Sequence, residues 1–189
     1  INNIEIQKNK NLMFKYFSNY FMNNYRSIIS DLFFMKLVGN DSIPEGINQL
    51  RIGEGILLGT DTTHNSAIEA LAQDTFILRS EIVELKEKSS VPVGIVGLDA
   101  FGNQPHFEDM GIRRRAIISL GRQDVNIDGI IPTDPDIFIL GASSDHMLID
   151  VTDSQQQLKV GDTISFKLNY QGLLHLSNTR YVAKNYIDK

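Results

Sequence analysis

The segment Gly46-Ile-Asn-Gln-Leu-Arg-Ile-Gly-Glu-Gly-Ile-Leu-Leu-Gly59 places one permanent cation, Arg51, among apolar residues and follows it with three glycines. An Arg side chain in apolar surroundings is costly unless an acceptor or an anion pairs with it. Glycines close behind it let a backbone approach another group tightly and expose N–H donors to that group. The segment therefore indicates a ligand with an anionic or acceptor end.

Two common glycine motifs fit this segment poorly. Gly53, Gly55 and Gly59 are spaced as G-x-G-x-x-x-G, one residue longer than the dinucleotide fingerprint. The Gly-Lys-Ser/Thr ending of a Walker loop is also missing. The alternative without a ligand is a buried strand whose glycines permit close packing.

Composition limits the classes of function. The chain has 189 residues, of which 42% are hydrophobic, and this predicts a packed core for one domain or one domain plus an appendage. A net charge of -5 argues against nucleic acid or an anionic membrane as the main partner. The run Arg113-Arg114-Arg115 is interpreted as solvated residues at the start of a strand.

The chain has no cysteine, which excludes disulfides, thiolate catalysis and cysteine-ligated zinc. Its four histidines show no H-x-x-x-H spacing, so no metal site is expected. No signal peptide and no apolar run of membrane-spanning length is present. These features predict a cytoplasmic protein without a membrane or nucleic-acid partner.

Hydrophobic periodicity predicts a mainly β protein preceded by a helical segment. Apolar residues at helical spacing predict a helix over Leu12–Leu37, and Ile47–Leu58 is interpreted as a buried strand with a turn. A short helix is expected at Ser66–Ala72, after which short strands with turn chemistry favour an antiparallel barrel or sandwich. The expected strands are Phe76–Leu85, Val91–Val96, Arg115–Leu120, Ile137–Leu140, Met147–Val151 and Thr163–Leu168.

Polar residues gather at the expected ends of strands. Gly121-Arg122-Gln123-Asp124 brings a cation and a carboxylate together, and Ser143-Ser144-Asp145-His146 combines hydroxyls, a carboxylate and an imidazole. Asn169-Tyr170-Gln171 places a phenol in a loop, and the stretch Asp99–Asp109 is too long for a simple hairpin loop. A hydrolase triad is disfavoured, because Ser144, Asp145 and His146 are contiguous and no G-x-S-x-G is present.

Leu50-Arg-Ile-Gly-Glu-Gly-Ile-Leu-Leu-Gly59 resembles the segment that ends the barrel of alanine-racemase-type enzymes, which depend on pyridoxal phosphate. The alanine/ornithine racemase subfamily is the most similar, and the resemblance runs from about Ile43 to the C terminus. It implies a division into a helical segment (1–42), a remnant of the cofactor-binding barrel (43–73) and a C-terminal β domain (74–189). The ending Arg180–Tyr186 resembles the family's terminal strand.

The resemblance implies roles for four cofactor-binding residues. Arg51 would face the pyridine nitrogen and keep it unprotonated, since a guanidinium does not give up a proton. The backbone N–H groups of Gly53 and Glu54 would bind the phosphate, and Tyr170 would donate a hydrogen bond to it. The reaction implied is α-proton exchange that interconverts L- and D-amino acids, in an enzyme that forms homodimers.

The resemblance also implies a substrate site with one departure from the usual pattern. Arg122 stands where alanine racemases have the Tyr of Gly-Tyr-Ala-Asp-Gly, and Ser144 and Asp145 match a pair at the substrate carboxylate. The second acid/base is then open, with Asp124, Asp145 and His146 as candidates. For an ornithine-like substrate, the distal ammonium would face a carboxylate: Asp99, Glu108 or Asp109.

The cofactor lysine of the family has no match. The early lysines, Lys8, Lys10, Lys15 and Lys36, stand in different contexts, and the chain starts at Ile1. The expectation is therefore a C-terminal portion that is inactive by itself. The alternative is a non-catalytic β-barrel binding or interaction module, with Leu12–Leu37 docking on a partner or on a second copy.

Overall fold

The computed structural model describes residues 2–8, 28–30, 49–51, 53–61, 66–98, 102 and 107–188. The chain forms two compact units. The first, called the β unit here, comprises Ile1–Ile4 and Leu78–Lys184, and the second comprises Glu5–Ile77 and Asn185–Lys189. In the part of the chain that the structure describes, no helix has the length and apolar character needed to cross a membrane.

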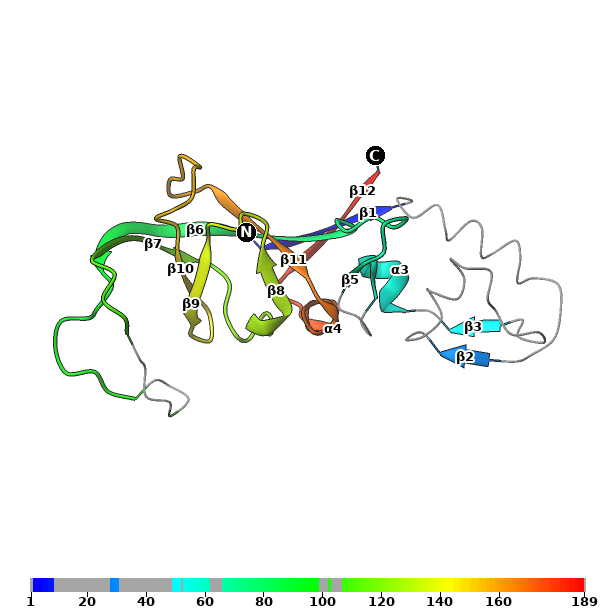
Figure 1. Cartoon of the computed structure of the whole chain (residues 1–189), viewed down its shortest axis with the longest axis horizontal. Coiled ribbons are helices and arrows are strands. Elements are labelled where there is room, and N and C mark those ends of the chain that lie inside the picture. The colour runs from blue at the N-terminus through cyan, green and yellow to red at the C-terminus, as the bar shows by residue number, and fades with distance from the viewer. Residues whose placement is uncertain are drawn as a thin grey trace. The chain divides into compact units, whose positions relative to one another are not determined.

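The β unit is built on a six-strand path of hydrogen-bonded neighbours. In order along the sheet these are β9 (Phe138–Ala142), β10 (Met147–Asp150), β7 (Ile112–Ile118), β6 (Phe76–Ser89), β11 (Thr163–Leu168) and β8 (Ile130–Pro132). The first and last strands of this path, β9 and β8, are consecutive in the chain, separated only by residues 133–137. The sheet therefore curls into a nearly closed barrel (Figure 1).

Alternation along the strands builds the core of this barrel. On β6, Leu78, Ser80 and Ile82 are buried while the residues between them are half-buried. The antiparallel register then places Ile118 opposite both Ile82 and Met147, so buried residues of neighbouring strands meet. Other buried side chains of the core include Ala116, Ile149, Ile164 and Phe166. Such period-two burial is what a sheet with one face on the core requires.

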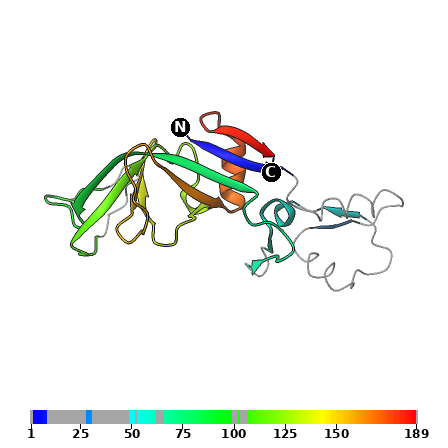
Figure 2. The same cartoon turned by 90° about the horizontal axis from the view of Figure 1, so that it is seen from above.

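Strand β6 is the longest, with 14 residues, and it pairs with β7 through Ile82–Ser89 and also with β11. Figure 2 shows it extending along the length of the sheet. The strand order continues from β6 to β1 (Asn3–Lys8) and β12 (Ala183–Asp188), and the division between the two units runs through both of these strands.

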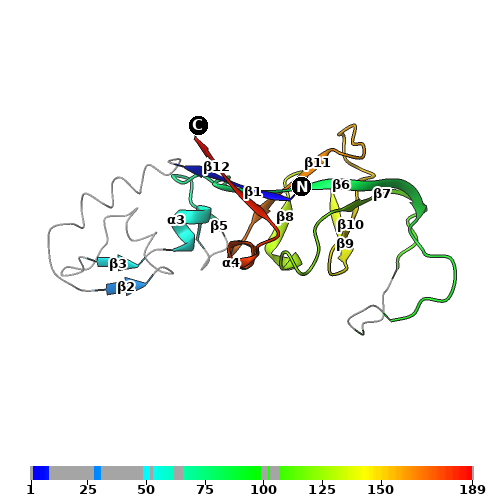
Figure 3. The ribbon, with the colours of Figure 1, turned by 180° about the vertical axis from the view of Figure 1, so that it is seen from behind.

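Helix α4 (Tyr170–Asn178) follows β11 and packs against the short 3-10 helix η1 (Ile127–Gly129). The side chain of Asn169 caps α4 by accepting a hydrogen bond from Gly172 N (3.1 Å), and its amide donates to Asp128 O (2.9 Å). Gly129 and Gly172 approach so closely that neither position has room for a Cβ. Helix α4 also contacts β11 (Figure 3), and its buried residues are Gly172, Leu173 and Leu176.

The second unit has short elements in its described parts. β2 (Ile28–Ser30) pairs in parallel with β3 (Gln49–Arg51), and β4 (Thr60–Asp61) pairs antiparallel with β5 (Ser66–Ala67). Helix α3 (Glu54–Leu58) ends at Gly59, which adopts φ 67° in the left-handed region that favours glycine.

The mainly β fold and most predicted strands are confirmed. β6, β7, β9, β10 and β11 lie at or within a few residues of their predicted positions, and β12 corresponds to the expected terminal strand. The predicted strand Val91–Val96 is wrong: Val93 and Ile95 are fully exposed. Pro92 cannot donate to a ladder and Gly94 adopts φ 123°, so this stretch does not continue a sheet.

Three predictions near the N terminus also need correction. In the described part of Ile47–Leu58, Gln49–Arg51 form a strand and Glu54–Leu58 form helix α3. The helix expected at Ser66–Ala72 is wrong, since Ser66 and Ala67 pair with β4 instead. Of the predicted helix Leu12–Leu37, only residues 28–30 are described, and these form β2; two adjacent β-branched isoleucines favour a strand there. The rest of that prediction lies outside the described residues.

Candidate functional site

Two loops of the β unit bring five predicted site residues together. The turn 121–125 follows β7, and the turn 143–146 joins β9 to β10. Their backbones are hydrogen-bonded: Arg122 N donates to Ser143 O (2.9 Å) and Gln123 N donates to Ser144 O (3.0 Å). Gly121 lies so close to the Ser144 carbonyl that a Cβ at residue 121 has no room. The contact fixes Arg122 and Asp124 beside Ser144, Asp145 and His146.

Asp124 is buried, with 4% of its surface exposed. Its Oδ2 accepts a hydrogen bond from Gly121 N (3.0 Å), while its own N–H donates to Gly121 O (3.0 Å). A carboxylate used in this way closes the turn that carries Arg122.

Ser144, Asp145 and His146 lie on an exposed turn. Asp145 accepts from Gln123 Nε2 at Oδ1 (2.5 Å) and from Ser144 Oγ at Oδ2 (2.7 Å). The Ser144 hydroxyl thus donates to a carboxylate, and this arrangement does not give the activated nucleophile that a hydrolase needs. The turn is closed by Ser143, whose N–H donates to His146 O (2.8 Å).

Arg122 is exposed, and its Nε donates to Ala142 O (3.1 Å). Tyr170 is the first residue of α4 rather than part of a loop, and 49% of it is exposed. The helix start is held by Asn169 and by the bond from Asn126 Nδ2 to Gln171 Oε1 (2.8 Å). Two features of the sequence indicate this helix: Asn169 can cap its start, and Leu173 and Leu176 lie on one face of it.

The remaining cofactor candidates belong to the second unit. Arg51 is the last residue of β3, where it pairs with Ser30 in the parallel register. Gly53 is exposed and precedes α3, and Glu54 is the first residue of that helix. The structure therefore brings Arg51, Gly53 and Glu54 together in one unit, and Tyr170 and the two-loop cluster in the other.

A cleft of about 620 Å³ lies on the outer face of the barrel beside the two-loop cluster. Its floor includes Ile117 of β7 and Leu148 of β10, which are register partners, and His146 lines it as well. Glu108 and Arg115 add charge to the lining. Pattern reasoning did not find this cleft, because its walls come from segments far apart in the sequence.

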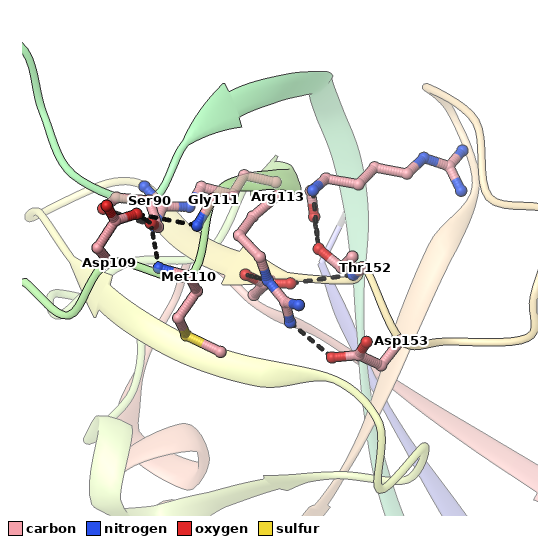
Figure 4. Close-up of polar contacts among 10 residues, drawn as sticks. Ser90, Asp109, Met110, Gly111, Arg113, Thr152 and Asp153 are labelled. Atoms are coloured by element: carbon pink, nitrogen blue, oxygen red, sulfur yellow. Dashed lines mark hydrogen bonds and ion pairs between the residues drawn. The ribbon is translucent and has the colours of Figure 1, made fainter.

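Hydrogen bonds between Ser90 and residues 110–111 hold the two ends of the stretch 91–110 together in a narrow neck (Figure 4). Ser90 N donates to Gly111 O (2.8 Å), Met110 N donates to Ser90 Oγ (2.7 Å) and Gly111 N donates to Asp109 Oδ1 (3.0 Å). Of the three carboxylates suggested for a distal ammonium, Asp109 is thus engaged at the neck, Glu108 lines the cleft and Asp99 lies outside the described residues.

The basic run 113–115 is bound into the structure, so its interpretation as solvated residues is wrong. Arg113 Nε donates to Asp150 Oδ2 (3.0 Å) and its NH2 group donates to Asp153 Oδ2 (2.5 Å), as Figure 4 shows. These bonds raise the pKa of Arg113. Burial raises the pKa of Asp150, but the hydrogen bonds from Arg113 and Thr152 outweigh it and leave that pKa below its usual value. Arg114 and Arg115 donate to the carbonyls of Leu158 and Ser90.

Similar solved structures define the class of fold. No family model matches the chain. The biosynthetic alanine racemase from Pseudomonas aeruginosa superposes with a TM-score of 0.59 at 15% identity, covering 96% of this chain and 54% of that one. Alanine racemase from Bartonella henselae, solved with covalently bound pyridoxal phosphate, gives a TM-score of 0.51 at 14% identity, covering 96% and 66%. The fold is that of the mainly β domain of alanine-racemase type.

Sequence relatives define the particular group. The chain is 48% identical over 148 residues to ornithine racemase from Acetoanaerobium sticklandii. It is 51% identical over 147 residues to lysine racemase from Thermotoga maritima. Each match covers 78% of this chain but only 42% and 41% of the relative, so the chain spans about two fifths of their length. The chain is therefore a homologue of the ornithine and lysine racemases, matching a portion of each.

Proposed function

We propose that this chain is the C-terminal part of a pyridoxal-phosphate-dependent racemase that acts on a small amino acid. The observation that carries the proposal is identity of 48% and 51% to two racemases across 78% of the chain. The fold alone would be weaker support, because one fold hosts many chemistries.

The chemistry of the candidate cofactor residues suits pyridoxal phosphate. A guanidinium pairs with a ring nitrogen and stays charged, while backbone N–H groups and a phenol are donors for a phosphate. Gly53 is exposed next to the N–H groups at the start of α3, and Tyr170 is half-exposed at the start of α4. We assign Arg51, Gly53, Glu54 and Tyr170 to the group by this donor chemistry and by the family pattern. When bound, pyridoxal phosphate supplies the electron sink that makes an α-proton acidic.

Racemisation requires proton exchange on two opposite faces of the α-carbon. Asp145 and His146 are adjacent on one exposed turn. Asp124 is the weaker of the three candidates, because its carboxylate holds the turn at Gly121. We infer that Asp145 or His146 handles the proton on one face, and that a group outside this turn handles it on the other.

Arg122 and Ser144 lie on the two bonded loops and are proposed to bind the substrate carboxylate. Arg122 is exposed, and a guanidinium matches a carboxylate in geometry and charge. Glu108, exposed and lining the cleft, is the described carboxylate best placed for a distal ammonium. The substrate class is then a diamino acid of the ornithine or lysine type.

The decisive experiment joins this chain to the portion of the Acetoanaerobium sticklandii ornithine racemase that it does not match. The chimera should bind pyridoxal phosphate and racemise ornithine or lysine faster than alanine, measured by chiral chromatography. The 189-residue chain alone should show no racemisation and no internal Schiff-base absorbance. A folded, cofactor-loaded chimera without racemisation of any of the three amino acids contradicts the proposal and favours the non-catalytic module. Robust activity of the chain alone contradicts the partial-enzyme interpretation.

The role of Arg51 has its own test in the same chimera. Arg51→Lys replaces the fork of donors by a single ammonium that can lose its proton, so racemisation should fall and side reactions should rise. Arg180→Lys, an exposed position of the β unit, is the control. Unchanged kinetics and reaction specificity in Arg51→Lys would contradict the assignment of Arg51 to the pyridine nitrogen of the cofactor. Light scattering of the chimera tests the homodimer that we also propose.

A further inference from the structure

The cleft beside the two-loop cluster has the size and lining of a ligand site. Its volume of about 620 Å³ is within the range of small-molecule pockets. Ile117 and Leu148, side by side on the outer face, form an apolar floor, and Phe107 and Met110 of the long loop line it too. An apolar floor with few charged groups suits a small molecule with an aliphatic body.

Arg115 provides the charge that such a ligand would meet. It stands on β7 two residues before Ile117, so its side chain is on the same outer face. One NH2 group donates to Ser90 O (3.1 Å). Its Nε is buried and has no hydrogen-bond partner among the residues that the structure describes. A buried, charged N–H without an acceptor is unfavourable, so the described chain satisfies this guanidinium only in part.

The other charges in the cleft leave Arg115 as the dominant anchor. Lys88 lines the cleft, but its ammonium is bonded to Glu84 Oε1 (2.7 Å). Glu108 is exposed and opposes Arg115 in sign, so it competes with an incoming anion. Guanidinium groups bind carboxylates through charge-assisted hydrogen bonds.

We propose that this cleft binds a small carboxylate with an aliphatic body, with the carboxylate on Arg115 and the body on Ile117 and Leu148. The site uses none of the four residues assigned to the cofactor, and it shares Glu108 and His146 with the proposed substrate site. The carboxylate can belong to an amino-acid substrate or to another organic acid, and both share the same recognition chemistry.

The test is a titration of the 189-residue chain, labelled at the methyl groups of Ile, Leu and Met, with hexanoate, hexylamine and hexanol. Hexanoate should shift the methyl signals of Ile117, Leu148 and Met110, while hexylamine and hexanol at equal concentration should not. Arg115→Gln should weaken hexanoate binding about tenfold or more, as expected for loss of a charge-assisted bond. Arg180→Gln, the same charge change at an exposed site of the β unit, should leave it unchanged.

Two further variants keep the test informative if Arg115→Gln unfolds. Arg115→Lys retains the charge and should bind hexanoate more weakly than the native chain but better than any neutral variant. Glu108→Gln, on the exposed loop, should bind hexanoate more tightly because the competing carboxylate is gone. Two results would overturn the proposal. One is equal binding of hexylamine and hexanoate. The other is native hexanoate affinity in both Glu108→Gln and Arg115→Lys. Competition of hexanoate by ornithine identifies the amino acid as the source of the carboxylate, and its absence points to another organic acid; both results support the site.

Discussion

Gly121 lies directly against the carbonyl oxygen of Ser144, with no room for a Cβ between the two turns. This contact aligns Arg122 N with Ser143 O and Gln123 N with Ser144 O. The geometry of the two-loop cluster therefore depends on the absence of a side chain at residue 121.

Gly121→Ala should destabilise the chain by about 1–3 kcal/mol, because the added methyl forces the two backbones apart. The change is measured as a lower midpoint of urea unfolding. Gly97→Ala is the matched control, since nothing lies within 4 Å of a Cβ built there. Equal midpoints for the two variants would show that the contact is easily relaxed.

Asp124 gives a way to separate a structural role from a catalytic one. Asp124→Ala should cost about 1–3 kcal/mol of stability, because Gly121 N–H loses a buried acceptor. Asp124→Asn keeps one carbonyl oxygen and should cost less. In the chimera, Asp124→Asn should retain most of its racemase activity; near-complete loss with unchanged stability would instead assign Asp124 to proton transfer.

The pair Arg113–Asp150 predicts a pH dependence of stability. The pKa of Asp150 lies below its usual value in the folded chain, so its contribution is fully present above the unfolded-state pKa and is lost as pH falls through the folded-state pKa. The stability gap between the native chain and Asp150→Asn should therefore be largest near neutral pH and should shrink as the pH is lowered below about 4.

Urea midpoints at a series of pH values measure this gap. Glu84→Gln is the control, because hydrogen bonds from Lys86 and Lys88 lower the pKa of Glu84 to about 2 at an exposed position, where ion pairs contribute little. A gap for Asp150→Asn that stays constant down to the lowest pH would contradict the assigned ion pair.

The close approach of Gly129 and Gly172 predicts how Tyr170 is positioned. Gly172→Ala places a methyl against Gly129 O, so the start of α4 must move and carry Tyr170 with it. The chimera should then bind pyridoxal phosphate more weakly, as followed by absorbance. Leu174→Ala, at an exposed position of the same helix, should bind it normally. If Gly172→Ala binds pyridoxal phosphate with native affinity, Tyr170 does not contribute to binding the phosphate.

The strands that could be predicted are those whose own residues carry a signal for β structure. Strand β11 alternates polar and apolar residues, while β6, β7 and β10 each contain short apolar runs; both signals are visible in a single sequence. The three-residue β8 was missed, since it exists only through its pairing with Phe166, Lys167 and Leu168. Ser66–Ala67 was misassigned for the same reason: its partner strand, not its composition, makes it a strand.

For the candidate site, the sequence predicts individual residues but not how the fold brings them together. Arg122, Asp124, Ser144, Asp145 and His146 were selected from two motifs, and the structure brings those motifs together through backbone bonds that no motif encodes. The acceptor role of Asp124 toward Gly121 and the cleft at Arg115 depend on tertiary contacts, so neither could be predicted from residue spacing.

The turns 121–125 and 143–146 are joined by N–H and C=O groups that every residue except proline carries. Substitutions at residues 122, 123, 144 and 145 can therefore change the chemistry displayed on this surface while the frame beneath them stays the same. A frame of this kind is evolvable, because side chains at these four positions can be replaced one at a time while Gly121 and the buried Asp124 keep the turn in place.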